Sequence, residues 1–213
     1  MKIGILGAGN IGATAARLFI AAGHEVAVSN SRGPDSLRGL AQELGPRAHA
    51  MTIDGAALFG EVVLLAVPWR SPEALPRPEL LRGKIVIDAM NPYHPDGGFY
   101  DLGGSTSSEL VLKRMPGVRL VKAFNTIYYV HLASRGRKEL PHDDRHTIYV
   151  AGDDTAAKAV VSQLIEDIGF AAVDTGSLRE GGRLQEPESP IYNQTYNARE
   201  AREFLATLQR QPQ

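Results

Sequence analysis

Short apolar runs alternate along the chain with longer segments in which apolar residues recur every three or four positions. Such runs are typical of buried parallel strands, and the periodic segments are typical of helices that pack on a sheet. The expected strands lie at residues 2–6, 25–29, 48–51, 62–67, 84–89, 120–123, 146–151 and 171–174. This alternation predicts an α/β protein with a Rossmann-like, doubly wound, mostly parallel sheet and a small C-terminal extension.

Several of the expected helices begin at residues that can cap their first N–H groups. These signals are Asp54, Thr106 with Glu109, Asp153 or Asp154, and Asn197 with Glu200. A proline-rich helical stretch is expected to end at Leu81, and residues 176–185 are expected to form a polar loop. The tail at residues 209–213 is expected to fray.

The first apolar run is followed at once by a turn, Gly7 to Gly12, with the spacing G-x-G-x-x-G. Gly7 would make the tight turn, Gly9 would let a pyrophosphate reach bare backbone, and Gly12 would let the helix pack close to the sheet. Asn10 and Ile11 open that helix, whose N-terminal dipole favours phosphate. A purely structural turn is the alternative, but the strand–turn–helix context favours a dinucleotide site.

The end of the second strand indicates which dinucleotide is bound. NAD enzymes usually place Asp or Glu there to bind the ribose hydroxyls, whereas this chain has Asn30, Ser31 and Arg32. A carboxylate would repel a 2′-phosphate, and hydroxyl, amide and guanidinium groups would bind one. Arg32 as a solvated loop charge is the alternative, but its position favours NADP. Residues 1–150 are therefore expected to form an NADP-binding Rossmann domain, and residues 151–213 an extension packed on the same core.

The composition argues against several classes of protein. Lys and Arg number 23 against 24 Asp and Glu, so no bulk charge indicates nucleic acid or a membrane surface. Cysteine is absent, which removes disulfides and thiolate chemistry. No apolar stretch is long enough to span a membrane, and we expect a soluble, cytoplasmic protein. The run at residues 142–146 contains His and Asp but follows a proline, so a solvated loop is expected there and no metal site.

Residues at the carboxyl ends of the expected strands are candidates for ligand binding, because open α/β sheets bind ligands at that edge. They include Val67 and Pro68, followed by Trp69, for which core filling and ligand contact remain equally open. Asn91 follows the next strand. The glycines before Thr106 leave open an anion site at that helix start, although an ordinary capped helix is favoured.

Taken together, these residues resemble the NADPH-dependent coenzyme F420 reductases and related small NADP-binding reductases. The resemblance rests on the glycine turn, Asn30 to Arg32, residues 66–68, 88–92, 121–125 and 176–178. It implies that Ala123, Phe124 and Asn125 lie beside the nicotinamide and the bound deazaflavin. The family usually continues with Ile-Pro-Ala, where this chain has Tyr128, Tyr129 and His131. We expect these side chains to face the acceptor pocket, with Asn125, Tyr128 and His131 as candidates and no certain catalytic residue.

The leading hypothesis is an oxidoreductase that moves a hydride between NADP(H) and a flavin-like acceptor, with F420 as the first candidate and FMN or FAD next. Such a reaction needs stacked rings and no strong acid beside the reacting atom. The alternatives are an NADPH-dependent imine or carbonyl reductase and a non-catalytic NADP-sensing module. The expected partner is a small redox coenzyme, and a homodimer is left open.

Overall fold

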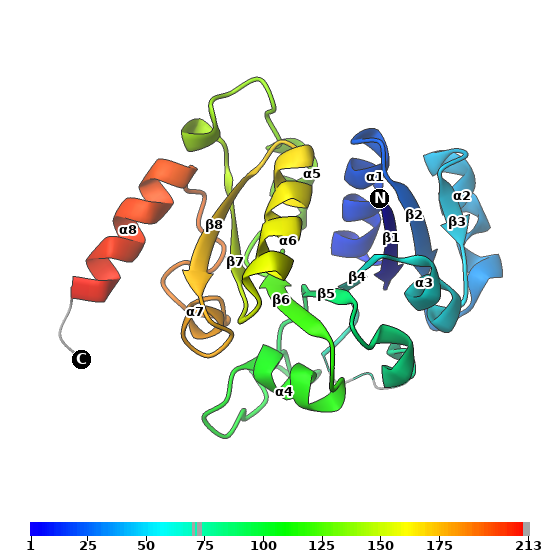
Figure 1. Cartoon of the computed structure of the whole chain (residues 1–213), viewed down its shortest axis with the longest axis horizontal. Helices are drawn as coiled ribbons and strands as arrows, with labels where there is room; N and C mark the ends of the chain where they lie inside the picture. Colours follow the sequence, from blue (N-terminus) through cyan, green and yellow to red (C-terminus); the bar gives the residue numbers. More distant parts are fainter. Residues whose placement is uncertain (70, 72–73, 211–213) are drawn as a thin grey trace.

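The computed structural model describes residues 1–69, 71 and 74–210. The described strands are β1 (Lys2–Leu6), β2 (Glu25–Ser29), β3 (Ala48–Ala50), β4 (Val62–Leu65), β5 (Ile85–Asp88), β6 (Arg119–Ala123), β7 (Thr147–Ala151) and β8 (Ala171–Gly176). They form one sheet in the order β3-β2-β1-β4-β5-β6-β7-β8 (Figure 1). The sheet is parallel from β3 to β6, and β7 pairs antiparallel with β6 and parallel with β8. This is the doubly wound, mostly parallel, Rossmann-like fold that the sequence predicted.

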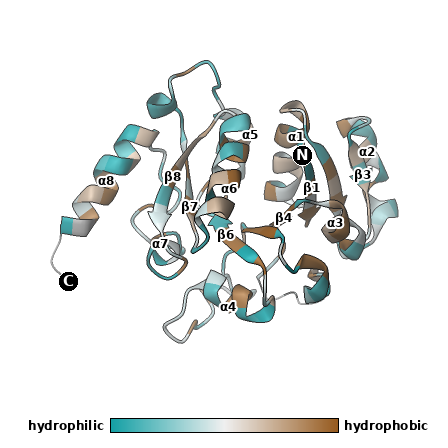
Figure 2. Cartoon of the chain, in the orientation of Figure 1, coloured by the Kyte–Doolittle hydropathy of each residue, from teal (hydrophilic) through white to brown (hydrophobic). Residues whose placement is uncertain are grey.

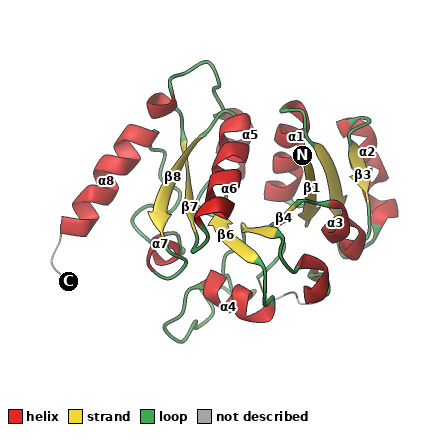
Figure 3. Ribbon diagram, in the orientation of Figure 1, coloured by secondary structure: helices red, strands yellow, loops and turns green. Residues whose placement is uncertain are grey.

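Helices cover both faces of the sheet (Figure 3). The α-helices are α1 (Asn10–Ala21), α2 (Arg38–Leu44), α3 (Ile53–Phe59), α4 (Ser107–Arg114), α5 (Tyr129–Ser134), α6 (Thr155–Asp167), α7 (Glu180–Leu184) and α8 (Ala198–Arg210). The 3₁₀ turns are η1 (Pro34–Leu37), η3 (Pro78–Leu81) and η4 (His142–Asp144).

Successive residues of a strand contribute their side chains to two separate apolar clusters, one on each face of the sheet, as expected for strands buried on both faces. Val121 packs with the cluster formed by α1, α5 and α6, whereas its neighbour Leu120 packs with α3 and α4. A third cluster lies between β8 and α8, which flanks the end of the sheet (Figure 1). The central strands accordingly include strongly apolar segments (Figure 2). The position after residue 150, expected as a domain boundary, falls within β7, and β8 joins the same sheet.

Three predicted caps are confirmed and one is wrong. Thr106 and Glu109 form a capping box, Asp154 caps α6, and Asn197 and Glu200 exchange hydrogen bonds before α8. Asp54, however, lies inside α3, whose cap is Thr52: the Thr52 hydroxyl accepts from the Gly55 amide at 3.1 Å.

Two local expectations also change. The glycine-rich segment at residues 176–185 contains the helix α7, where a polar loop was expected. The proline-rich stretch ends in the 3₁₀ turn η3, which Pro78 begins and which stops at Leu81 because the backbone of Arg82 is no longer helical. Residues 70 and 72–73 of that stretch, and residues 211–213 of the tail expected to fray, lie outside the described residues.

Candidate coenzyme and acceptor site

The three glycines of the first turn meet different steric environments. Gly7 has a φ of +102°, and a Cβ there would lie 2.2 Å from the Ala66 carbonyl oxygen. A Cβ on Gly12 would lie 1.8 Å from the Gly7 carbonyl oxygen. Around Gly9, by contrast, no heavy atom lies within 4 Å of an added Cβ. The fold therefore requires glycine at Gly7 and Gly12, and at Gly9 it leaves a bare, exposed backbone facing open space.

The N-terminus of α1 is suited to an anion. Its N-cap is Gly9, which supplies no side-chain hydrogen bond, and no acidic residue lies in the first turn. The first N–H groups at Asn10 and Ile11 thus keep their hydrogen-bonding capacity and the positive end of the helix dipole. This arrangement fits a pyrophosphate without any rearrangement of the turn.

A cleft of about 490 Å³ lies beside the end of β2 and is lined by Asn30, Ser31 and Gly33 together with Thr52–Asp54 and Leu75. The Asn30 carboxamide oxygen accepts from the Arg32 amide at 2.9 Å and shapes this loop. The Arg32 side chain is exposed and makes no hydrogen bond or ion pair with any described residue. Asp54 borders the same cleft, where Arg77 neutralises it at 3.0 Å.

Two further clefts, each of about 370 Å³, continue along the carboxyl edge of the sheet. The inner cleft is lined by Val67, Pro68 and Trp69, and the outer one by Phe124, Asn125 and several tyrosines. Both share Asn10, Ile11, Ala89, Asn91 and Tyr93. The two clefts are therefore one continuous space that begins at the α1 N-terminus.

Trp69 fills the core, one of the two roles that the sequence left open. It borders the inner cleft but is only 2% exposed, and its indole N–H donates to the Ser107 carbonyl at 3.3 Å.

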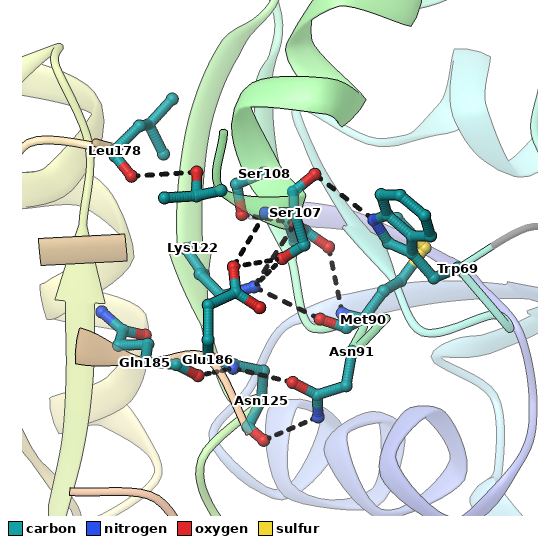
Figure 4. A network of polar contacts seen from close by, with 12 residues as sticks. Trp69, Met90, Asn91, Ser107, Ser108, Lys122, Asn125, Leu178, Gln185 and Glu186 are labelled. Atoms are coloured by element: carbon teal, nitrogen blue, oxygen red, sulfur yellow. Dashed lines mark hydrogen bonds and ion pairs between the residues drawn. The ribbon is translucent and has the colours of Figure 1, made fainter. Parts of the chain in front are cut away.

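Asn91 and Asn125 form the polar floor of the outer cleft (Figure 4). The Asn91 Nδ2 donates to the Asn125 carbonyl at 3.0 Å, and the Asn125 Nδ2 donates to the Asn91 Oδ1 at 3.0 Å. The Asn125 Nδ2 also donates to the backbone carbonyl of Gln185 at 2.6 Å. Because each amide nitrogen faces a backbone carbonyl, which can only accept, the orientation of both side-chain amides is determined.

The backbone changes direction between β6 and this floor. Phe124 has a φ of +66°, a left-handed conformation that non-glycine residues rarely adopt. Its fully buried ring packs edge-on against Phe19 at 6.1 Å between centroids, which holds this conformation in place. Left-handed residues of this kind cluster at functional sites. Phe124 and Asn125 line the outer cleft, whereas Ala123 lies in the core beneath it and not among the lining residues.

A buried ion pair that sequence reasoning missed supports the floor from below. Lys122 and Asp88 occupy paired positions on β6 and β5, both side chains are fully buried, and Nζ lies 3.8 Å from Oδ2. The ammonium also donates to the Ser107 hydroxyl at 3.0 Å and to the Met90 carbonyl at 3.3 Å. Asp88 accepts from the Ser108 hydroxyl at 2.6 Å and the Met90 amide at 3.0 Å. The signal was present in the sequence as a lysine inside the apolar run at residues 120–123.

A second missed residue, Glu186, joins the C-terminal segment to α4 (Figure 4). Its carboxylate accepts from the Ser107 amide at 2.8 Å and from the Ser107 hydroxyl at 2.7 Å. A carboxylate at a helix N-terminus is favourably placed in the helix dipole. The anion position that the sequence left open at the start of α4 is thus filled by the protein's own Glu186, and the capped-helix interpretation is confirmed.

Two tyrosines that sequence reasoning also missed close the outer cleft. The Tyr192 hydroxyl accepts from the Asn91 Nδ2 at 3.0 Å and lies 2.6 Å from the Tyr93 hydroxyl. Burial, followed by the hydrogen bond with Tyr93, raises the pKa of Tyr192. The sequence offered no signal for Tyr192, because its partners lie 99 and 101 positions earlier in the chain.

Of the three side chains at residues 128–131 that differ from the family pattern, only two lie where the sequence predicted. Tyr128 and Tyr129 line the outer cleft, with Tyr128 50% exposed, and the hydrogen bond with Tyr129 raises the pKa of Tyr128. His131 was expected to face the same pocket but is not among its lining residues. Its ring lies 6.2 Å from that of His146, and its Nε2 lies 3.4 Å from the Arg135 guanidinium. Its ring also lies 5.9 Å from that of Tyr128, edge to face.

Within the described residues, no group of three or more His, Asp or Glu side chains is placed to hold a metal ion. His142, Asp143 and Asp144 form exposed ion pairs instead, the two aspartates with Arg202 and Arg199 on α8. The same described part of the chain contains no helix that is both long and apolar enough to cross a bilayer.

Comparison with known proteins agrees with this geometry. Residues 2–92 match the family model described as NADP oxidoreductase, coenzyme F420-dependent. A solved structure of a hypothetical protein from Sinorhizobium meliloti is 33% identical, with a TM-score of 0.80 over 92% of this chain and 95% of that one. A protein from Arthrobacter sp. FB24, provisionally described as an F420-dependent NADP reductase, is 26% identical, with a TM-score of 0.72 over 98% and 91% of the two chains. The N-terminal part of the chain, residues 2–92, thus matches the coenzyme F420-dependent NADP oxidoreductase family.

The family match and the likeness to a protein described as an F420-dependent NADP reductase place the chain among NADP-dependent oxidoreductases, as the sequence predicted. The chain is also 30% identical over 185 residues to the rat metalloreductase STEAP3. That match covers 86% of this chain, which spans about a third (36%) of the length of the metalloreductase. NADP(H) is thus the nicotinamide coenzyme of this family, and the glycine turn with its uncapped helix N-terminus fits it.

Proposed function

We propose that this protein transfers a hydride between NADP(H) and a flavin-like acceptor, with the deazaflavin coenzyme F420 as the first candidate. The observation that carries the proposal is the outer cleft, which continues from the α1 N-terminus and is bordered by five aromatic side chains. They are Tyr93, Phe124, Tyr128, Tyr129 and Tyr192. Aromatic faces of this kind can stack on a planar ring system and exclude water from it.

The NADP half is assigned residue by residue. We assign the pyrophosphate to Gly7, Gly9, Asn10, Ile11 and Gly12, where the backbone is open and the helix N–H groups lack side-chain caps. We assign the binding of the 2′-phosphate to Asn30, Ser31 and Arg32, because the Arg32 guanidinium is exposed and makes no hydrogen bond or ion pair with any described residue.

The nicotinamide would then lie in the inner cleft, against Val67, Pro68 and Asn91, with Ala123, Phe124 and Asn125 at the junction with the outer cleft. When bound, the coenzyme supplies the hydride from its nicotinamide ring. The protein's part is to bind, orient and enclose: Asn91 and Asn125 present fixed amides, and the aromatic walls would stack on the acceptor ring.

The deciding experiment follows NADPH oxidation by absorbance with F420, FMN, FAD and a panel of carbonyl and imine compounds. We expect turnover with F420 or a flavin. Turnover with carbonyls or imines alone would instead identify an imine or carbonyl reductase, and NADPH binding without any turnover would identify a sensing module.

A further inference from the structure

We propose that Tyr192 donates the proton that accompanies hydride transfer in the outer cleft, and that Tyr93 replaces this proton from solvent. This inference rests on the proposed function, because it concerns the same acceptor. It adds a catalytic residue from the C-terminal segment, residues 185–193, to a site otherwise built from the first 130 residues.

The position of Tyr192 is firmly determined. Its ring lines the outer cleft with Phe124 and Asn125. The next residue, Asn193, donates its amide to the Thr126 carbonyl at 3.0 Å. At the other end of the segment, Glu186 is bound to the N-terminus of α4. The hydroxyl is therefore held at the cleft from both sides, and a proton donor must be positioned in this way to be effective.

The hydrogen-bond network leaves Tyr192 two directions in which to donate, toward Tyr93 or into the cleft. The Asn91 Nδ2 faces the Asn125 carbonyl, so the Asn91 amide can only donate to Tyr192. When Tyr93 also donates across the 2.6 Å contact, both lone pairs of the Tyr192 oxygen are used. The remaining hydrogen of Tyr192 is then free for a molecule in the cleft. Tyr93 is 50% exposed and exchanges protons with water.

Tyr192 also carries its proton under working conditions. Burial raises its pKa, so the phenol is neutral at any physiological pH. A neutral phenol beside an atom that gains negative charge donates a strong hydrogen bond and can pass its proton along it.

Other candidate donors in this region are less well placed. Tyr128 is half exposed and bonded to Tyr129. His131 lies outside the cleft lining, and His94 lies beside Asp96 and against the Tyr100 ring. None of these three groups is fixed in the cleft by a donated side-chain amide, as Tyr192 is.

The proposed step conserves atoms and electrons. The C4–H bond of the reduced nicotinamide breaks, and the hydride with its two electrons forms a new bond to the acceptor ring. An electron pair of the conjugated ring moves to a ring nitrogen or carbonyl oxygen. The O–H bond of Tyr192 breaks and its proton goes to that heteroatom. Tyr93 reprotonates the Tyr192 phenolate and recovers its own proton from water. The sum is NADPH, acceptor and one proton giving NADP⁺ and the two-electron-reduced acceptor.

The test compares Tyr192→Phe and Tyr93→Phe with the wild-type protein. Tyr196→Phe is the matched control, because that tyrosine lies in the same C-terminal part but packs against Phe204. For each variant, kcat is measured in H₂O and D₂O with every acceptor that the wild-type protein reduces. Binding of oxidised FMN and F420 is measured separately by fluorescence, and thermal unfolding checks that the fold is retained.

We expect Tyr192→Phe to lower kcat by about 10²-fold, the lower end of the range for a general acid, and to abolish the solvent isotope effect. The Kd of the oxidised acceptor should change less than about threefold, since the proton matters mainly in the transition state. Tyr93→Phe should give a smaller loss, and Tyr196→Phe none.

A Tyr192→Phe variant with wild-type kcat and an unchanged isotope effect would overturn this role for Tyr192, while turnover of F420 or flavin would leave the proposed function standing. If only carbonyls or imines are reduced, the proposed function fails, and the same variants still decide the role of Tyr192 in that reaction. If the wild-type protein reduces no acceptor, both proposals are wrong.

Discussion

The coenzyme end and the acceptor end of the cleft are built in different ways. The coenzyme end is mostly backbone from one continuous segment: a glycine turn, a helix N-terminus and the loop after β2. The acceptor end is mostly side chains, contributed by the loops after β5 and β6, the start of α5 and the C-terminal segment. A phosphate can be bound by main-chain N–H groups whatever the surrounding side chains, whereas an acceptor ring is recognised only by the groups around it. The first end therefore indicates a class of coenzyme, and the second decides the individual reaction.

The largest effect is expected for Gly9→Val, which should weaken NADPH binding at the coenzyme end without destabilising the fold. In Gly9→Val, the added side chain meets no protein atom within 4 Å of its Cβ, so the unfolding temperature should stay near wild type. The same side chain would occupy the place assigned to the pyrophosphate, and NADPH affinity should fall more than about 100-fold, or over 2.7 kcal/mol. Calorimetric titration with NADPH measures this.

Gly12→Ala is the matched control, since its Cβ would lie 1.8 Å from a carbonyl oxygen and should destabilise the fold itself. Wild-type NADPH affinity in Gly9→Val would show that the motif is only a structural turn.

The second prediction concerns the base of the acceptor end. Lys122→Met would leave the Asp88 carboxylate fully buried beside an apolar chain, so the free energy of unfolding should fall by about 3–5 kcal/mol. The double variant Lys122→Met with Asp88→Leu should lose less than the sum of the two single changes, because the charges are removed together. Denaturant titration measures all three proteins.

Lys113→Met, on the exposed side of α4, should change the free energy of unfolding by less than about 0.5 kcal/mol. A similarly small effect for Lys122→Met would mean that the buried pair of Lys122 and Asp88 contributes nothing to the stability of the fold under the outer cleft.

Coenzyme choice provides the third prediction. A charge-assisted hydrogen bond contributes about 1.5–3 kcal/mol, so Arg32→Ala should weaken NADPH binding about 10- to 150-fold and leave NADH nearly unchanged. Arg47→Ala, an exposed arginine that does not line the coenzyme cleft, is the control. Equal losses for both coenzymes would remove Arg32 from the 2′-phosphate site.

The smallest effects on turnover are expected at Tyr128 and His131, where the sequence differs from the family pattern. Tyr128→Phe and His131→Gln should each lower F420 or flavin turnover by less than about tenfold, below the usual effect of losing a general acid. Tyr128 is half exposed and His131 lies outside the cleft lining, so neither is fixed against an acceptor. Steady-state kinetics with the same acceptor panel decide this, and a hundredfold loss in either variant would reinstate an obligatory acid at these positions.

The residues that could be predicted from the sequence are those whose role depends on near neighbours. The spacing of Gly7, Gly9 and Gly12 specifies a turn within six positions, and the capping box of Thr106 and Glu109 spans only four. Asp54 was assigned wrongly because Thr52, two positions earlier, is also a capping residue. Sequence pattern alone does not decide which of two such residues begins a helix.

The acceptor end could not be predicted in the same way. Glu186 and Tyr192 lie in a segment without regular periodicity, and their partners, Ser107 at the start of α4 and Asn91 in the loop after β5, lie much earlier in the chain. Lys122 was visible as a charge in an apolar strand, but its partner Asp88 is specified by strand register, which only the assembled sheet shows. His131 was expected in the cleft from its nearness to Asn125 in sequence, and the rotation of α5 directs it elsewhere.

The late position of Tyr192 has a consequence for protein synthesis. The glycine turn ends at Gly12, and ribosomes add about 5–20 residues per second, so roughly 10–40 s separate the two residues during translation. Every residue proposed to bind the coenzyme, up to Asn125, is thus synthesised before the tyrosine that closes the outer cleft. The outer cleft is therefore completed only when the last segment of the chain folds against the finished sheet edge.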